Sequence, residues 1–544
     1  MLTEFSLTSL RRIARCFYTE LSERHELVFL PQEYPYVSEQ EKERMAEAFL
    51  QGCDVVAGVL DPALLAARRR LNSSVPFVFF TFGDLAVGGW EVRQNMASLT
   101  DRDVILVNCT SEVELAEKFF ANANVRIVPF ALDRSAFYVL DDEERRAARK
   151  KLRFRETDRV ILYAGRINPE KNVHALLSIF DVVCREVPNA YLVLAGTVEG
   201  GATLQRFNVS PVSLSNTFNR FISDMEMPER VITVTNPDAQ RMRELYNIAD
   251  VKVNLTLNPD ENFGLAQVEA MACGTPVIGT AWGGLKDTIV EGVTGYKVST
   301  GPTATGVKFS WWEAINKIVA LLRDAPAREG FRDACVREAQ RYTEAGFGDL
   351  MEEILAASVR DRELPAQPLR ATRFGEEFWT VCDPRWGGSP YRRGPRSEEL
   401  YRDLVEPFTA VSPEHVPADE PLQPDQVLCL ATPVHVDGTG GVRPDHVFHP
   451  FTAQAPDGDH DATRAVLAVM REEPAITVEQ LLARVGPVPQ VEGALAWMLD
   501  AGLLLRTRPM AGWSKPGIVD RRLGQTMFSV QQVDRSATDL IVYR

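Results

Sequence analysis

The feature that most constrains the fold is a repeated alternation of short apolar runs with helical stretches. Runs of about four to six apolar residues, separated by helices, are typical of buried parallel strands with helices on both faces. The first series consists of Leu27–Leu30, Val55–Leu60, Phe77–Phe80, Val104–Val107 and Arg126–Phe130. The second series consists of Val160–Ala164, Tyr191–Ala195, Val231–Thr235, Val251–Leu255, Pro276–Gly279 and Gly295–Val298. The sequence therefore predicts two doubly wound α/β domains.

Composition narrows the class of function. Lysine and arginine total 60 against 75 acidic residues, which gives a net charge of −15 and a pI near 5.2. This charge argues against a general nucleic-acid binder and gives no support to broad adhesion to anionic lipid. We see no signal-peptide pattern, no apolar stretch near the length of a membrane span and no Cys-x-x-Cys pair among eight cysteines. We expect a cytoplasmic protein with reduced thiols, and peripheral association with the inner membrane face stays open.

Two carboxylates, Glu261 and Glu269, bracket seven residues where a predicted strand gives way to a predicted helix. The helix should open at Gly264-Leu265, so Glu269 stands about one turn inside it. A helix N-terminus presents unpaired amides that suit a phosphate or sugar oxygen, and Gly264 allows close backbone approach. Glu269 is able to accept hydrogen bonds from two vicinal hydroxyls. The competing interpretation is an ordinary strand–loop–helix unit with an acidic first turn.

Two cations follow the first strand of the second series. The strand ends at Gly165, Arg166 comes next, and Lys171 sits five positions later at the mouth of the following helix. Fixed cations at the carboxyl end of a parallel strand are placed for a pyrophosphate. Most such cations taken alone are solvated, but here the carboxylate pair, Ala272–Pro276 and Gly283-Gly284 follow in order.

This order of motifs resembles family 4 of the GT-B glycosyltransferases, the retaining group that uses nucleotide-sugar donors. The likeness is strong over residues 158–300, weaker through 100–157, and stops near 360. It implies an α/β fold of the GT-B type, with two facing Rossmann-like domains. Residues 1–150 would be the acceptor domain, 151–345 the donor domain, and 346–364 a helix that crosses back to the first domain.

The resemblance also implies a role for each motif residue. Arg166 and Lys171 would bind the donor diphosphate and neutralise the departing nucleoside diphosphate. Glu269 would hold the ribose hydroxyls, and Glu261 would face the transferred sugar. The loop at Thr235 would flank the base. Further donor contacts would come from Gly165, Phe263, Gly264 and Leu265. We expect neither a metal nor another cofactor, and the leaving phosphate would take the acceptor proton in a same-face displacement.

Two departures from the family pattern concern the first domain. The chain opens with a helix and its first glycine is Gly52, so the first strand is either missing, through a late start site, or remodelled. At Thr81-Phe-Gly83-Asp84, Gly83 occupies the place where a histidine often follows the strand. Asp84 is either a partial substitute for that histidine or a loop-capping aspartate.

Beyond Pro365 the chain becomes rich in proline, arginine and glycine, which predicts a connecting region over 365–455 with some strands. Residues 456–544 are predicted to form a winged-helix-like α+β module, because three helices at 462–471, 476–484 and 488–499 precede a short strand. The third helix has no lysine or arginine, so protein or peptide docking, or structural support, fits better than DNA binding.

Two other features of the sequence have simpler interpretations than a binding site. The His/Asp-rich stretch at 435–461 has no zinc spacing, so we interpret it as a polar loop. Arg11–Arg15 and Arg68–Arg70 are interpreted as solvated helix faces rather than membrane contacts.

We therefore expect a retaining hexosyl- or other glycosyltransferase whose acceptor is a small molecule, glycan, lipid or peptide. One rival is a non-catalytic GT-B scaffold whose tail binds a partner. Another is a GT-B phosphorylase or nucleotide-sugar epimerase, which needs acid–base groups that the motifs do not show.

Overall fold

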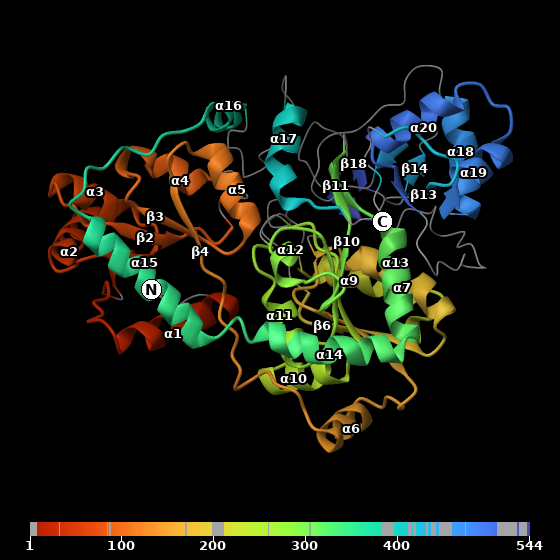
Figure 1. The fold of residues 1–544 in the computed structure, drawn as a ribbon, viewed down its shortest axis with the longest axis horizontal. Helices are drawn as coiled ribbons and strands as arrows, with labels where there is room; N and C mark the ends of the chain where they lie inside the picture. Colours follow the sequence, from red (N-terminus) through yellow and green to blue (C-terminus); the bar gives the residue numbers. More distant parts are fainter. Residues whose placement is uncertain are drawn as a thin grey trace. The chain divides into compact units, whose positions relative to one another are not determined.

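The computed structural model forms two compact units, whose elements are labelled in Figure 1. Unit 1 comprises Met1–Phe137, Pro259–Glu269 and Arg337–Arg392, and unit 2 comprises Tyr138–Asn258, Ala270–Val336 and Arg393–Arg544. The structure describes residues 8–31, 33–83, 85, 89–168, 171–198, 211–258, 261–303, 306–381, 397–411, 416, 420–430, 434–436, 442–444, 460–473, 475–508, 530–532 and 541–543.

Unit 1 is built on a four-stranded parallel sheet in the order β1-β2-β3-β4. Both central strands, β2 and β3, are buried along their whole length, as the apolar runs predict. The strands are β1 (Val56–Val59), β2 (Phe77–Phe80), β3 (Val104–Val107) and β4 (Asn124–Ile127). The helices between Thr8 and Phe119 are α1 (Thr8–Ser22), α2 (Glu39–Gln51), α3 (Pro62–Arg70), α4 (Trp90–Asn95) and α5 (Thr110–Phe119).

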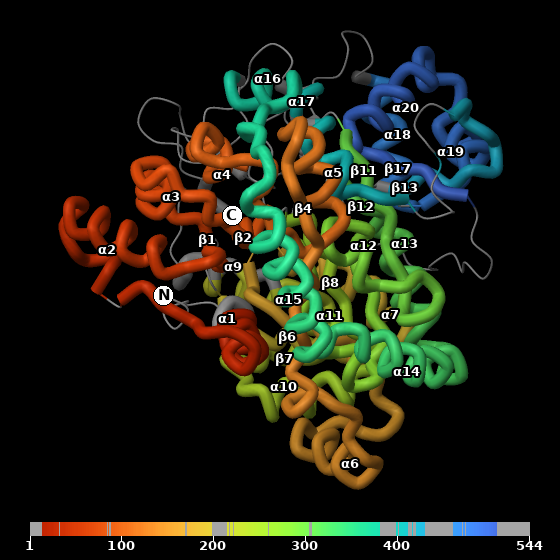
Figure 2. The backbone as a smooth tube through the Cα atoms, turned by 60° about the vertical axis from the view of Figure 1, so that its left-hand side comes forward, coloured from red at the N-terminus to blue at the C-terminus, as the bar shows by residue number. Residues whose placement is uncertain are grey.

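Two helices from distant parts of the chain lie side by side in unit 1, α1 and α15 (Glu344–Asp361) (Figure 2). The ring of Phe17 in α1 meets the ring of Phe347 in α15 edge-on, with centroids 6.5 Å apart. Buried side chains of both helices share one apolar cluster with β2 and β3. The cluster includes Cys16, Leu21, Val78, Phe80, Val104, Leu106, Phe347, Met351, Ile354 and Leu355. The chain thus returns to unit 1 after it has built the sheet of unit 2.

The strand predicted at Leu27–Leu30 is wrong. These residues carry no strand, and the side chains of Val28 and Phe29 are 53% and 51% exposed. Phe29 packs on Tyr18 of α1, with ring centroids 6.0 Å apart. A run of four apolar residues does not by itself distinguish a buried strand from an extended segment lying over a helix.

The solvated interpretation of Arg68–Arg70 is wrong for its first residue. Arg68 is buried at the C-terminal end of α3 and forms a two-pronged ion pair with Asp103, with N···O distances of 2.5 and 2.9 Å. Its guanidinium also lies 4.6 Å from the ring centre of Phe77. Arg70 pairs with Glu47 on α2. This basic group therefore joins elements of unit 1.

Unit 2 contains a six-stranded parallel sheet in the order β10-β9-β8-β5-β6-β7. All six predicted strands of the second series are confirmed, and the inner strands β5, β8 and β9 are buried over most or all of their length, whereas the edge strand β7 is partly exposed. The strands are β5 (Arg159–Ala164), β6 (Ala190–Ala195), β7 (Val231–Val234), β8 (Val251–Asn254), β9 (Val277–Thr280) and β10 (Gly295–Val298). The helices of unit 2 are α6 (Asp142–Lys151), α7 (Val173–Glu186), α9 (Pro211–Ser223), α10 (Ala239–Ile248), α12 (Leu285–Thr288) and α13 (Trp311–Arg323). Two more helices are shared, because α11 (Leu265–Ala272) begins in unit 1 and ends in unit 2, and α14 (Ala325–Ala339) begins in unit 2 and ends in unit 1.

The stretch 365–455 contains helices as well as the expected strands. Helix α16 packs in unit 1, where Phe374 and Phe378 lie 5.4 and 5.3 Å from the ring of Phe119 on α5. The elements are α16 (Arg373–Val381), α17 (Ser397–Val405), β13 (Val427–Leu430), β14 (Val434–Val436) and β15 (Val442–Pro444). Proline frequency led the prediction to miss the two helices, although their aromatic and leucine residues recur at helical spacing.

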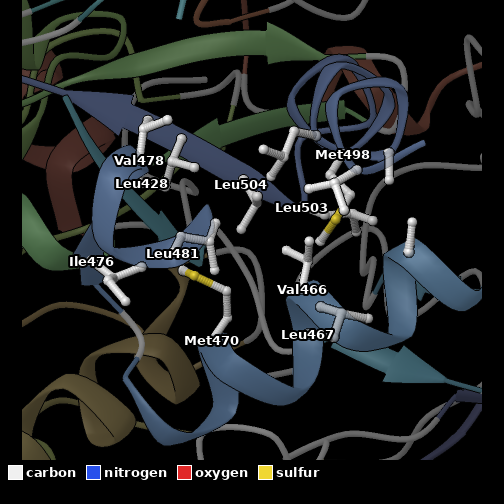
Figure 3. Close-up of a cluster of buried hydrophobic side chains, with 14 of the residues drawn as sticks. Leu428, Val466, Leu467, Met470, Ile476, Val478, Leu481, Met498, Leu503 and Leu504 are labelled. Carbon is white, nitrogen blue, oxygen red and sulfur yellow. The ribbon is translucent and has the colours of Figure 1, made fainter. Parts of the chain in front are cut away.

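The last compact part of unit 2 is a three-helix cluster on a three-stranded antiparallel sheet (Figure 3). Its elements in chain order are β13, α18 (His460–Glu472), β16 (Ala475–Thr477), α19 (Val478–Val485), α20 (Val491–Asp500) and β17 (Leu504–Thr507). Strand β13 lies between β16 and β17. The core between sheet and helices includes Leu428, Val466, Met470, Leu481, Leu495, Met498 and Leu504. None of the helices described in the chain combines the length and apolarity needed to cross a bilayer.

A candidate donor site at the switch point of the second sheet

The strand order of unit 2 reverses between β5 and β8. From β5 the chain builds outward through β6 and β7, and from β8 it builds in the other direction through β9 and β10. In open parallel sheets, ligands bind outside the carboxyl ends of the strands at such a reversal. The segments that leave these two strands carry the predicted cations and lead to the predicted carboxylates. The predicted motif residues therefore follow the two strands at which the order reverses.

The loop after β5 is closely packed. Gly165 has a φ of +149° and donates its N–H to the carbonyl of Ala195, at 3.0 Å. A Cβ on Gly196 would lie 1.9 Å from the carbonyl oxygen of Gly165, so that position admits only glycine without movement. The hydroxyl of Tyr163 donates to the carbonyl of Arg166 at 2.5 Å. The backbone that carries the first predicted cation is thereby held on two sides.

Lys171 stands at the end of the same loop. Its N–H lies 3.3 Å from the carbonyl oxygen of Asn168 and 3.1 Å from its side-chain oxygen, and both cationic side chains of the loop are half-buried. Asn172 follows in the left-handed region with φ +52°, and its side-chain amide donates to the carbonyl of Leu255 at 2.9 Å. This bond links the segment of Lys171 directly to the segment that follows β8. The motif reading did not single out Asn172 for this role.

The segment after β8 is also held from the β9 side. The Thr280 hydroxyl donates to the carbonyl of Thr256 at 2.5 Å, and the indole N–H of Trp282 donates to the carbonyl of Asn258 at 2.8 Å. Three side chains, one at the start of α7 and two from β9 and the loop after it, therefore hold the backbone between residues 255 and 258. Such fixed backbone is what a preorganised binding site requires.

The segment Pro259–Glu269, which carries the predicted carboxylates, groups with unit 1. Asn262 and Phe263 are both buried there, and Phe263 lies edge-on to Phe130 and Tyr342, with centroids 5.3 and 5.2 Å away. Gly264 has a φ of +84° immediately before α11, which begins at Leu265 as predicted. Glu269 lies in α11 and is 7% exposed. The structure thus assigns Glu261 to Glu269 to one unit and Gly165, Arg166, Lys171 and Thr235 to the other.

Asn108 is a buried polar residue whose connection to this segment was not recognised in the sequence. Its side-chain oxygen accepts a hydrogen bond from the amide of Asn262 at 3.0 Å, while its own amide donates to the carbonyl of Val128 at 2.8 Å. Its backbone N–H donates to the buried carboxylate of Glu112 at 2.9 Å. Because Asn108 directly follows β3, the rule that polar residues at carboxyl ends of parallel strands form sites would have selected it.

Thr235 is exposed after β7, next to Asn236 in the left-handed region with φ +47°. The side chains of Asn236 and Thr197 hydrogen-bond to each other. This turn lies beyond the carboxyl end of β7, on the same edge of the sheet as Gly165, because β5, β6 and β7 are parallel. The order of β5, β6 and β7 places it two strands away from Arg166.

The third residue of the turn after β2 is Gly83, which has no side chain that could contact a ligand. Gly83 is buried with φ +92°, a conformation that a histidine would adopt only with strain. Phe82 before it has φ +46° and stacks on Phe80, with ring centroids 5.0 Å apart. Asp84 lies outside the described residues. The glycine is therefore required by the path of the backbone.

The arrangement of His, Cys, Asp and Glu side chains decides whether the chain could hold a metal ion. Within the described part of the chain, no group of three or more His, Cys, Asp or Glu side chains is arranged to hold a metal ion. Most of the predicted polar loop, including Asp445–His449 and Asp457–Asp459, lies outside the described residues. Burial lowers the pKa of His174, on the first turn of α7, to about 4, so this imidazole is neutral at pH 7.

Comparison with known proteins relates part of the chain to glycosyltransferases. Residues 144–328 match the family described as Glycosyl transferases group 1. D-inositol 3-phosphate glycosyltransferase of Corynebacterium aurimucosum is 27% identical over 262 residues, which cover 47% of this chain and 57% of that protein. The enzyme of the same name from Mycobacterium bovis is 30% identical over 256 residues, 46% of this chain and 47% of that protein. The chain thus spans about half the length of these curated relatives.

Solved structures with similar architecture include two proteins at 18% identity. Anabaena Alr3699/HepE, solved in complex with UDP and glucose, has a TM-score of 0.48 and covers 63% of this chain and 89% of its own. Sucrose-phosphate synthase from Thermosynechococcus elongatus has a TM-score of 0.45 and covers 59% and 80%. The sequence match thus relates the segment 144–328 to the glycosyltransferases of group 1.

Proposed function

We propose that this chain is a retaining glycosyltransferase of the GT-B class, family 4, that moves a sugar from a nucleotide-diphosphate donor to an acceptor in the cytoplasm. The observation that supports it most is the reversal of strand order between β5 and β8. The two segments leaving those strands are joined by the hydrogen bond from Asn172 to Leu255. One segment carries Arg166 and Lys171, and the other leads to Glu261 and Glu269.

In the proposed reaction, negative charge develops on the donor diphosphate that Arg166 and Lys171 would bind. When the bond from the sugar's anomeric carbon to the donor phosphate breaks, negative charge develops on the departing diphosphate. Arg166 and Lys171 would stabilise that charge by hydrogen bonds to phosphate oxygens. The acceptor hydroxyl would attack the same face of the sugar, and its proton would pass to the departing phosphate oxygen. Glu261 would then face the sugar without forming a bond to it, and Glu269 would hold the ribose.

A buried amide adds support for an anionic ligand. Asn168 lies between the two cations in the sequence and is fully buried, with 0% exposure. Its side-chain oxygen accepts from Lys171, whereas its NH₂ group has no acceptor among the described residues. A buried donor left without an acceptor costs about 1–3 kcal/mol. A phosphate oxygen bound beside the loop would remove that cost.

The proposal is tested by titrating the full chain with UDP, GDP and ADP by calorimetry, followed by the matching nucleotide sugars. Arg166→Ala should weaken nucleotide binding by about 10- to 100-fold, because a hydrogen bond to a charged group contributes about 1.5–3 kcal/mol. Arg153→Ala, outside the loop, serves as the control for removing a cation. If none of the nucleotides binds the wild-type chain, the proposed function is wrong.

Gly83 favours a second candidate, a non-catalytic scaffold that still binds the nucleotide. A buried glycine at φ +92° supplies no group to meet a sugar, where the family often has a histidine. Slow hydrolysis of a bound nucleotide sugar separates the two candidates. Turnover supports the enzyme, whereas tight binding without turnover, even with acceptors present, supports the scaffold.

We infer that the C-terminal part includes a winged-helix-like module that binds protein or peptide rather than nucleic acid. The supporting order is helix, strand, two helices and strand, with β13 completing the sheet between β16 and β17. Arg506 has its side chain buried in β17 at 2% exposure, and Arg508 pairs with Glu420 at 3.7 Å. Arg506 is therefore not available to a phosphate backbone, which leaves the exposed Arg508 as the cation of this strand end. The module should show no binding to a mixed-sequence DNA duplex at physiological salt, and tight salt-dependent binding would contradict this inference.

A further inference from the structure

A short piece of the C-terminal extension packs on the loop between β9 and α12. The N–H of Gly283 donates to the carbonyl of Phe408 at 3.0 Å, and the N–H of Ala410 donates to the carbonyl of Ala281 at 3.0 Å. The N–H of Thr300 donates in turn to the carbonyl of Ala410 at 2.9 Å. Residues Glu406–Ala410, which we call the brace, therefore pair with the second unit's backbone almost as an added strand. They lie outside the segment that matches the glycosyltransferase family.

The brace is also held by a cation. The ammonium of Lys286, in α12, donates to the carbonyl of Pro407 at 2.5 Å and lies 3.4 Å from the carbonyl oxygen of Thr409. Pro407 is part of the short helix Glu406–Phe408, and Thr409 directly follows it. Carbonyl groups at the end of a helix lack partners within the helix, and Lys286 supplies a donor to these two. The contact holds Pro407 and Thr409 of the brace against α12.

Trp282 connects the brace to the segment after β8. It is 1% exposed, and its ring lies against that of Phe408, with centroids 5.3 Å apart and planes inclined by 31°. Its indole N–H donates to the carbonyl of Asn258, the last residue before the segment that carries Glu261. One face of the indole thus contacts the C-terminal extension. Its polar edge supports residues 255–258, the segment after β8, which we call the donor loop.

We propose that the brace and Trp282 position the donor loop, so that the C-terminal extension is a working part of the nucleotide-sugar site. The inference rests on the proposed function. Trp282 is a positioning residue, because it acts on the ligand through the backbone of the segment after β8, at the carbonyl of Asn258. Without the brace, the indole of Trp282 loses the aromatic ring of Phe408 against which it packs, whereas the supports of the segment after β8 from Asn172 and Thr280 remain.

The proposal contradicts the simpler expectation that the tail is a separate attachment. If the tail were independent, removing its contact should leave nucleotide binding unchanged. The contacts named above predict instead that small changes in the brace weaken binding, although no brace residue is placed on the nucleotide itself. The loss of nucleotide affinity should be larger than the loss caused by the same substitution elsewhere in unit 2.

The test compares Trp282→Phe with Trp312→Phe in the full chain. Trp282→Phe keeps an aromatic ring against Phe408 but removes the N–H that reaches Asn258. Trp312 is also buried, at the start of α13, and gives the matched control for shortening an indole. Phe408→Ala removes the packing, and Phe408→Leu restores most of the apolar volume should the alanine variant fail to fold.

Two readouts separate positioning from general destabilisation. UDP affinity should fall about three- to tenfold in Trp282→Phe and remain unchanged in Trp312→Phe, since one net hydrogen bond is lost. Amide hydrogen exchange should accelerate in peptides covering residues 255–258 while it stays unchanged in β3. Phe408→Leu should recover most of the affinity lost in Phe408→Ala.

The outcomes are distinguishable from failure of the proposed function. If wild type binds a nucleotide and Arg166→Ala weakens binding, but Trp282→Phe and Phe408→Ala both bind like wild type with unchanged exchange at 255–258, the brace inference is wrong alone. If wild type binds no nucleotide at all, the proposed function fails and this inference with it.

Discussion

Gly196→Ala is the sharpest test of how the loop after β5 is built. The added Cβ would lie 1.9 Å from the carbonyl oxygen of Gly165, whereas a carbon and a carbonyl oxygen normally approach to about 3.3 Å. The loop must therefore move by roughly 1.4 Å, and Arg166 is the next residue. Overpacking of this kind costs about 1–3 kcal/mol of stability. A displacement of about 1 Å in a binding group can cost 100-fold in function, so we expect at least a tenfold loss of UDP affinity.

Gly292→Ala is the matched control for this change. Gly292 also has a positive φ, +69°, but no heavy atom lies within 4 Å of an added Cβ. Its substitution should cost about 1–2 kcal/mol from backbone strain and leave nucleotide affinity unchanged. Calorimetric titration with UDP and thermal unfolding measure the two effects separately. Equal UDP affinity in the two variants would refute the close packing of Gly165 against Gly196.

Three further predictions concern stability and reactivity. Burial lowers the pKa of His174 to about 4, so below pH 6.5 the unfolded chain binds a proton that the folded chain does not. The free energy of unfolding should therefore fall from pH 6.5 toward pH 4, by about 3 kcal/mol at most. In urea titrations, His174→Gln should reduce this dependence on pH. Arg68→Met should cost about 3–5 kcal/mol by leaving the Asp103 carboxylate buried alone, and an unchanged urea midpoint would contradict the ion pair. Burial raises the thiol pKa of Cys184 and Cys429 to about 12, so neither should be alkylated at pH 8 until the chain is unfolded, as peptide mapping would show.

The regular part of the fold follows from local pattern. Each strand of the second sheet is a short, mainly apolar run between helices, and the repetition of such runs is typical of a parallel sheet. The opening of α11 at Leu265 could be predicted because Gly264 ends the loop and apolar periodicity begins after it. The run Leu27–Leu30 failed because its two central side chains are exposed, a property that four letters do not encode.

The supports of the site could not be predicted from local pattern. Asn108 and Asn262 are separated by 154 positions, and nothing near either residue indicates the partner. The same holds for Trp282 and Phe408, whose rings meet only after the tail has folded back on unit 2. Arg68 looked like one of three solvated cations, and its burial depends on Asp103 from another strand connection. Motif spacing identifies residues that follow strands, whereas the contacts that hold them depend on tertiary packing.

The most direct test of the central claim is calorimetric titration of the full chain with UDP, GDP and ADP, alongside Arg166→Ala and Glu269→Ala. We predict that one of these nucleotides binds the wild-type chain and that both substitutions weaken its binding by tenfold or more. Unchanged affinity in both variants would contradict the assignment of the site to the loops after β5 and β8.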